Sequence, residues 1–263
     1  MEGLVSGTTM TGSEEITLRS PREIEKMREA AKIIVLTLKE LKKAAQPGIT
    51  TKELDNLAGR IFRENDAVSG SLNYHGYPGN ICVSLNEQVV HGIGGPLQLR
   101  DGDIVKFDVA ASHKGYFADS TLTFPVGEIR PEVARLLKVT EEALFKGIDK
   151  AVVGNRVSDI SHAIQRHVEK NGLSIVRAFV GHAIGRNMHE APQVPHFGPP
   201  HQGPLLRPGM VLAIEPQVNM GSPEITVLDD HWTAITKDGK WSAHFEHTVA
   251  ITNNGPDVLT RWD

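Results

Sequence analysis

The order of predicted elements repeats along the chain, and this repeat constrains the fold more than any other feature. Ser20-Pro21-Arg22-Glu23 forms a capping box, and apolar residues follow at helical spacing as far as Ala45. A second helix is predicted from Thr51 to about Asn65. Short apolar runs broken by turns come next, which is typical of antiparallel strands, predicted at residues 81–85, 89–93, 104–111 and 116–126.

The same order follows Pro131. Two helices are predicted at residues 132–151 and 157–171, the second closed by Gly172, and strands at 174–180, 211–218, 224–228 and 243–252. We interpret this as an internal duplication with pseudo-repeats at about 20–126 and 131–252, although no residues match between the halves. The expected fold is one α+β domain over residues 15–263 after a flexible tail at 1–14. Helices would cover facing antiparallel sheets, with a site between the halves.

Composition excludes several classes of function. The net charge is −4 and no run of five like charges occurs, so binding to nucleic acid or to a membrane surface is not expected. The single cysteine, Cys82, predicts a reducing cytoplasm, and no apolar stretch reaches membrane-spanning length. Glu14 and Glu15 stand where an export signal would be basic. Twelve histidines are many for this length and favour a metal site.

Two aspartates flank a predicted hairpin over residues 105–119. If the chain turns at His113-Lys114, Asp108 and Asp119 are direct cross-strand partners with Cβ atoms about 4.5–5.5 Å apart. Like charges so placed destabilise a hairpin unless a proton or cation lies between them, and a divalent metal is predicted. The alternative is a slipped register or one aspartate that points outward at a turn.

Three further residues support a metal site. Glu215 ends an apolar strand before Pro216, Glu246 alternates with apolar residues in the predicted strand 243–252, and His182 lies in an apolar, glycine-flanked stretch. Taken alone, each glutamate is more often an ordinary surface acid, and a lone histidine in such a stretch is more often a hydrogen-bonded core residue than a ligand.

Together, four carboxylates and one imidazole are too rich in oxygen for a structural zinc site. They favour two divalent ions of the manganese, iron or cobalt type about 3.5–4 Å apart, sharing a water that becomes hydroxide near neutral pH. Because the chain lacks a glycine-rich phosphate loop and clustered lysines or arginines, the predicted reaction is amide hydrolysis.

Residues 73–93, the two-aspartate hairpin, and residues 181–190, 213–216 and 245–248 together resemble type I methionine aminopeptidases, from about Ile16 to the C-terminus. The resemblance implies the "pita-bread" fold, a duplicated α+β domain. It implies removal of the initiator methionine from nascent chains when the second residue is small, by metal-activated hydroxide attack on the first peptide bond. The short interval from His182 to Glu215 leaves no room for a type II subdomain, so the short bacterial form is expected.

The resemblance also implies roles for individual residues. The metal ligands would be Asp108, Asp119, His182, Glu215 and Glu246, with Asp119 and Glu246 bridging two ions of cobalt, manganese, iron or zinc. Glu215 would move a proton from water to the new amine. His189 would hydrogen-bond the scissile carbonyl oxygen and His91 would contact the leaving nitrogen. The substrate's α-amino group would bind the second metal, which would explain exopeptidase action, because an internal amide has no free amine to offer.

The methionine pocket is implied at Tyr74, Tyr77, Cys82 and Trp232, around the thioether. Ser71 and Met188 stand where the family commonly has cysteine and phenylalanine, and we expect them to alter affinity or side-chain tolerance. A monovalent cation is implied at the backbone carbonyls of Asn86, Gln88 and Ser242. The expected partner is a nascent N-terminus at the ribosome, and the expected state is a monomer.

Two alternatives remain open at this point. An Xaa-Pro peptidase would share the fold and the five ligands, but it usually carries a separate N-terminal domain and lacks the Tyr-His-Gly-Tyr-Pro run at 74–78. A metal-free binding protein on the same scaffold would typically have lost ligands. Cleavage of Ala-Pro peptides would indicate the first, and the absence of any metal dependence the second.

Overall fold

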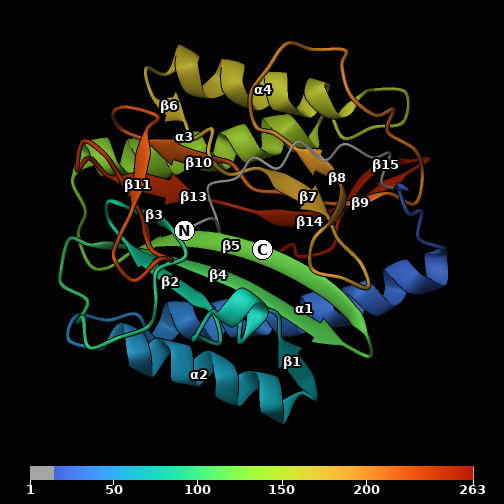
Figure 1. The fold of residues 1–263 in the computed structure, drawn as a ribbon. Helices are drawn as coiled ribbons and strands as arrows, with labels where there is room; N and C mark the ends of the chain where they lie inside the picture. The colour runs from blue at the N-terminus through green and yellow to red at the C-terminus, as the bar shows by residue number, and fades with distance from the viewer. Residues whose placement is uncertain (1–14, 263) are drawn as a thin grey trace.

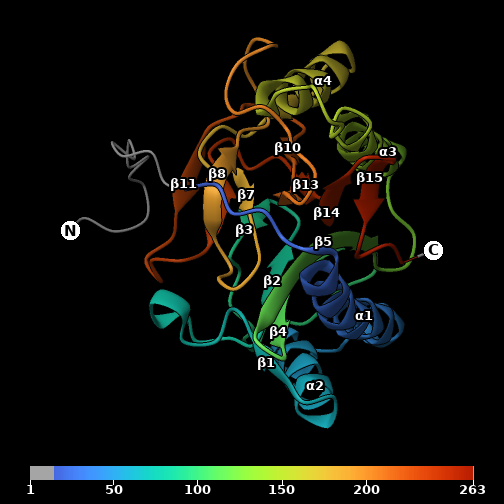
Figure 2. The ribbon, with the colours of Figure 1, turned by 90° about the vertical axis from the view of Figure 1, so that its right-hand side faces the viewer.

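A computed structural model describes residues 15–262 of the chain; the tail predicted at 1–14 lies outside these residues. All four predicted helices are confirmed, and the largest difference is at the end of α3. The helices are α1 (Pro21–Ala44), α2 (Thr51–Glu64), α3 (Pro131–Ile148) and α4 (Val157–Lys170). Figure 1 shows α1 and α2 below the sheets and α3 and α4 above them, and Figure 2 confirms this layering from the side.

The first helix shows how sequence positions an outer layer. Ser20 and Glu23 form the predicted capping box, so two otherwise unpaired amide groups of the first turn are satisfied. The buried stripe of α1, which includes Met27, Ile34 and Leu41, packs against the two long strands β4 and β5. In the described chain no helix is both long and apolar enough to cross a bilayer.

Most strands are short and antiparallel. Their bounds are β1 (Ala67–Ser69), β2 (Cys82–Leu85), β3 (Gln88–Val90), β4 (Ile104–His113), β5 (Tyr116–Pro125), β6 (Ser174–Ile175), β7 (Gly181–Ala183), β8 (Glu190–Val194), β9 (Val211–Ile214), β10 (Gln217–Asn219), β11 (Ile225–Val227), β12 (Ala234–Thr236), β13 (Ser242–His244), β14 (His247–Thr252) and β15 (Gly255–Val258). Within residues 15–262 they form four sheets: β1-β4-β2 with β5 beside β4, β13-β10-β6, β11-β12-β3, and β15-β14-β9-β7-β8.

The predicted register of the β4–β5 hairpin is wrong. The turn lies at Lys114-Gly115, so Asp108 pairs with Thr121, and Asp119 pairs with Ala110. Lys114 and Gly115 both have positive φ, 50° and 76°, which is the backbone that a two-residue turn of type I′ requires. The two aspartates are therefore diagonal neighbours on one face of the hairpin and not direct partners.

Two strands that were predicted as continuous are each broken in the middle. Residues 211–218 divide into β9 and β10 around Glu215-Pro216, and residues 243–252 divide into β13 and β14 around Phe245-Glu246. Ile214 pairs with His247 and Gln217 with His244, so one register runs through both breaks. Glu215 and Glu246 consequently lie opposite each other where the chain changes sheets. The prediction that Glu246 projects from a strand is wrong in this respect.

The remaining strand predictions differ in length. The strand expected at 174–180 is only Ser174–Ile175, the one at 89–93 is Gln88–Val90, and Ile225–Val227 confirms the one at 224–228. The unpredicted strands β1, β7, β8, β12 and β15 have three to five residues each, too few for an apolar periodicity to stand out.

Buried hydroxyl groups join the two halves along β5. Ser120 Oγ donates to Glu246 O at 2.7 Å, Thr123 Oγ1 to His244 O at 2.6 Å, and Thr248 Oγ1 to Asp119 O at 2.7 Å. These bonds satisfy main-chain carbonyls that lack a strand partner at the junction. Both Asp119 and Glu246 are therefore held at the boundary between the halves.

We expect Asp55→Ala to destabilise the fold by about 2–4 kcal/mol, because two buried amide groups would lose their acceptor. Asp55 Oδ1 accepts from Asn80 N at 2.6 Å and from Ile81 N at 3.2 Å, and so anchors the entry to β2 on α2. Urea unfolding monitored by circular dichroism measures the change. Glu40→Ala, which breaks an exposed pair with Lys43, is the control and should shift stability by less than about 0.5 kcal/mol. Equal effects of the two variants would contradict the anchoring role.

Candidate metal centre

A single pocket of about 180 Å³ collects every residue that the sequence predicted for metal binding, catalysis and methionine binding. Its wall combines carboxylates, histidines, aromatic rings and two sulfur-containing side chains. The lining residues are Ser71, Tyr74, His75, Tyr77, Cys82, His91, Asp108, Ala110, Asp119, His182, Met188, His189, Glu215, Trp232 and Glu246. Of these, His75 and Ala110 were not predicted.

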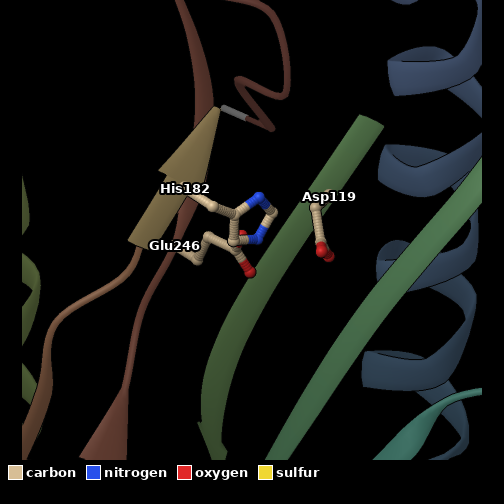
Figure 3. A group of neighbouring side chains, drawn as sticks. All are labelled: Asp119, His182 and Glu246. Carbon is tan, nitrogen blue, oxygen red and sulfur yellow. The ribbon is translucent and has the colours of Figure 1, made fainter. Parts of the chain in front are cut away.

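Asp119, His182 and Glu246 form the tightest group of potential metal ligands. One ligand atom from each lies within 4.8 Å of the others. Figure 3 shows the three side chains approaching one another from β5, β7 and the segment between β13 and β14. Asp119 Oδ1 and Glu246 Oε1 are buried and have no hydrogen-bond partner among the described residues. Since buried carboxylate oxygens are rarely left unpaired, these atoms fit a site built to hold a cation.

The close packing of β7 explains how His182 reaches this group. A Cβ at Gly181 would lie 2.3 Å from Ala213 O of the neighbouring β9, so only glycine permits the approach. His182 Nδ1 donates to Ala183 O at 3.0 Å, and burial lowers the pKa of the ring to about 3. The imidazole is therefore neutral, with its Nε2 lone pair available as a metal ligand.

The pocket environment strongly disfavours the charged forms of its carboxyl groups. Burial raises the pKa of Asp108 to about 6. Burial, followed by repulsion from neighbouring carboxylates, raises the pKa of Asp119, Glu215 and Glu246 well above their usual range. The metal-free pocket therefore retains protons near neutral pH, and divalent cations would displace them.

Two side chains that the sequence analysis missed hold Glu215. Gln217 Nε2 donates to Glu215 Oε2 at 2.9 Å, and His196 Nε2 accepts from the Glu215 amide at 3.2 Å. The second bond replaces the ladder partner that the amide loses where β9 ends. Gln217 is fully buried beside Pro216. A polar residue in the apolar run 211–218 was the one sequence signal that could have indicated its role.

Beside this group in the same pocket, neutral histidines meet aromatic rings. Burial lowers the pKa of His189 and of His91 to about 4. Tyr74 Oη and His189 Nδ1 are hydrogen-bonded at 2.7 Å, which orients the ring and leaves Nε2 free for another partner. Tyr77 packs edge-on against Trp232 with ring centroids 5.1 Å apart. Cys82 pairs with Asp108 across β2 and β4, so the thiol stands directly beside the carboxylates.

The predicted monovalent cation does not fit the residues present. Lys106 Nζ donates to Asn86 O at 2.9 Å and to Ser242 O at 2.8 Å, and these are two of the three carbonyls assigned to that ion. In this chain the two oxygens face an ammonium group. Lys106 was not predicted, because a lysine inside an apolar strand offers no motif.

We expect the pocket carboxyl groups to lower the stability of the metal-free protein as pH rises from about 5 to about 7. Their folded pKa values are raised above the unfolded ones, so the native state binds more protons at these groups and their contribution to the unfolding free energy falls with pH. Asp108 alone contributes a fall of about 1 kcal/mol over this window, which for this chain length corresponds to about 2–3 °C in Tm, and Asp108→Asn removes this contribution.

Thermal unfolding in chelator, and again with saturating manganese, measures this effect. Manganese should raise Tm most at the upper end of the window, because protons no longer compete there. The buried histidines act in the opposite direction in the same window, because the unfolded chain protonates His182 and His91 while their folded pKa values are only about 3 and about 4. Since the wild type and Asp108→Asn share these histidines, the difference in Tm between the two proteins isolates the Asp108 carboxyl group. An equal change in Tm between pH 5 and 7 for both proteins in chelator would contradict the assigned pKa shift of Asp108.

Comparisons with known proteins agree with this geometry. The sequence profile of metallopeptidase family M24 matches residues 25–253. Methionine aminopeptidase 1 of Bacillus subtilis is 53% identical over 246 residues, which cover 94% of this chain and 99% of that protein. The crystal structure of a methionine aminopeptidase from Thermotoga maritima has a TM-score of 0.91 and 43% identity, and the match covers 94% of this chain and 100% of that one.

A more distant structure shares the fold alone. Prolidase from Pyrococcus furiosus has a TM-score of 0.76 at 20% identity, and the match covers 94% of this chain and 66% of that one. The fold predicted from sequence, the pita-bread arrangement with helices outside antiparallel sheets, is confirmed. The chain belongs to metallopeptidase family M24.

Proposed function

We propose that the chain removes the N-terminal methionine from polypeptides whose second residue is small. The observation that carries this proposal is the pocket in which four carboxylates and a neutral imidazole face two further neutral histidines and a group of aromatic and sulfur-containing side chains. The name of the 53% identical relative supports the same activity. The carboxylates and the imidazole suit divalent metal ions, and the aromatic and sulfur-containing side chains suit a thioether.

The proposed ligands are Asp108, Asp119, His182, Glu215 and Glu246, all in the wall of this pocket. Divalent ions bound there would supply Lewis acidity toward the scissile carbonyl and lower the pKa of a bound water. The partnerless oxygens Asp119 Oδ1 and Glu246 Oε1 support the bridging role proposed for these two residues. Which metals the protein uses, and whether two are bound, belongs to this proposal.

Glu215 is the proposed proton carrier. Its raised pKa means that the carboxylate accepts a proton readily, and it can then pass that proton to the departing amine. The Gln217 amide holds Oε2 at 2.9 Å, while Oε1 lies 3.5 Å from His182 Nε2 and is the oxygen proposed to exchange the proton. His244 Nε2 lies 3.8 Å from Oε2, and burial lowers the pKa of this ring, so it brings no competing positive charge.

His189 and His91 are the proposed contacts to the peptide bond. Because both rings are neutral near pH 7, they can donate through N–H without repelling metal ions. His189 would stabilise the charge that develops on the carbonyl oxygen, while Tyr74 fixes its ring. His91 would hold the nitrogen of the leaving peptide.

Tyr77, Cys82 and Trp232 are the proposed walls for the methionine side chain, together with Tyr74. Met188 and Ser71 line the same pocket, where the family commonly has phenylalanine and cysteine. A methionine can adapt to side chains that a rigid ring excludes, so we expect tolerance toward unbranched analogues of methionine such as norleucine.

We place the protein in the cytoplasm, acting on nascent chains at the ribosome as a monomer. The free, buried Cys82 and the balanced charge support this setting. Residues 15–263 would constitute a single catalytic domain made of two pseudo-repeats, at about 20–126 and 131–252. The helix, helix, strand order of both segments supports this division.

Hydrolysis of Met-Ala-Ser, Met-Glu-Ser and Ala-Pro-Ala tests the proposed specificity. The enzyme is stripped with chelator, and manganese, cobalt, iron or zinc is added back singly. We expect release of methionine from Met-Ala-Ser only, and only with metal, because a large second residue would not fit beside the metal centre. Cleavage of Ala-Pro-Ala would indicate an Xaa-Pro peptidase, and no turnover with any metal would indicate a binding protein on the same scaffold.

Glu215→Gln should lower kcat by about 10²-fold or more while the protein stays folded, because an amide cannot relay a proton. Methionine release from Met-Ala-Ser measures kcat, and circular dichroism checks the fold. Glu224→Gln is the matched control, since Glu224 is an exposed acid outside the pocket, and its kcat should equal that of the wild type. A wild-type rate in Glu215→Gln would remove Glu215 from the mechanism.

A further inference from the structure

Lys106 is a buried cation without an anionic partner. Its side chain is 1% exposed, in the middle of β4. Among the described residues no carboxylate lies within ion-pair distance of its Nζ atom, although Glu87 favours the charge from farther away. Buried lysines are costly unless they are paired, so the position requires an explanation.

The acceptors of Lys106 are two main-chain carbonyls from different halves of the molecule. Asn86 belongs to the turn between β2 and β3, and Ser242 is the first residue of β13. Ser242 N also donates to Asn86 O at 3.1 Å, so these two segments meet directly at the ammonium. Nζ therefore joins β4 and β13, which belong to two different sheets, with the turn that leads from β2 to β3.

The turn at Asn86 is itself tightly specified. Its φ is 45°, and its side chain donates to Asp103 Oδ1 at 2.9 Å and accepts from Ile104 N at 3.0 Å. The Asn86 carbonyl is therefore oriented by the hydrogen bonds of the Asn86 side chain and not by pairing within a sheet. Carbonyl oxygens that converge in this way bind monovalent metal ions in other proteins by replacing their hydration shell.

We propose that the Lys106 ammonium is an internal cation that takes the place of a monovalent metal ion at the carbonyls of Asn86 and Ser242. As a positioning residue it fixes the start of β13, four residues before Glu246. The consequence is that this chain assembles its two halves without sodium or potassium. The effect concerns the fold around the pocket and does not depend on which peptide the pocket accepts.

Two variants of Lys106 and three salts test the proposal by thermal unfolding of the metal-free protein. The salts are potassium, sodium and choline chloride at equal ionic strength, since choline is too large to enter the site and controls for screening. Because burial lowers the pKa of Lys106 to about 7, the measurements are made at about pH 6.

The wild type should have the same Tm in all three salts. Lys106→Ala should unfold about 5 °C or more lower in choline, because the buried Ser242 carbonyl loses its ammonium donor while the Asn86 carbonyl retains the Ser242 amide. Potassium or sodium should restore part of this loss, and Tm should rise with the logarithm of their concentration, because alanine leaves space for an ion. Lys106→Met should be equally destabilised without recovery, because its side chain fills that space.

Lys39→Ala is the matched control, since Lys39 is an exposed lysine of α1. The Tm of this variant should be independent of the salt. A wild-type Tm that depends on potassium or sodium over choline would overturn the proposal, and this arm decides even if neither variant folds. A Lys106→Ala protein with one Tm in all three salts would also overturn it. If potassium or sodium raised the Tm of Lys106→Met as much as that of Lys106→Ala, the ions would be acting at another site, and this result would overturn the proposal.

Discussion

Repulsion among four buried carboxyl groups is the constraint on which the rest of the structure depends. Asp108, Asp119, Glu215 and Glu246 line one pocket. Burial raises the pKa of all four, and repulsion from neighbouring carboxylates raises it further for Asp119, Glu215 and Glu246. Such a cluster is stable only if protons or cations neutralise it, or if the surrounding fold is rigid enough to keep the four carboxylates from moving apart. The fold provides that rigidity, because the four carboxylates come from both halves and each is held by its own segment of the chain.

The broken strands show how that rigidity is built. Glu215 and Glu246 lie at matching interruptions of one antiparallel ladder, where a side chain cannot be held by regular pairing. Their amides are satisfied instead by His196 and by Thr121 O. Hydroxyls of Ser120, Thr123 and Thr248 then close the junction between the halves. Because these bonds are short-range and directional, they fix the carboxylates more tightly than apolar packing alone could.

The sequence was sufficient for the helices and for the identity of the pocket residues, but not for their geometry. Amphipathic periodicity and the Ser20 capping box specify helices locally, and those predictions were confirmed. The hairpin register depended on the handedness of the turn at Lys114-Gly115, which apolar alternation does not report. Gln217, His196 and Lys106 contact residues distant in sequence or hidden behind a strand break, so no local pattern could have revealed their roles.

Charge balance connects the pocket with Lys106. The histidines near the carboxylates, His182, His189 and His91, all have lowered pKa values and add no positive charge. The only buried lysine of the described core lies two residues before Asp108 on the same strand face, yet it turns to carbonyls and forms no ion pair with the pocket. A lysine paired with a carboxylate would compete with divalent ions for it. By engaging neutral oxygens, Lys106 stabilises the junction while the four carboxylates remain available to metal.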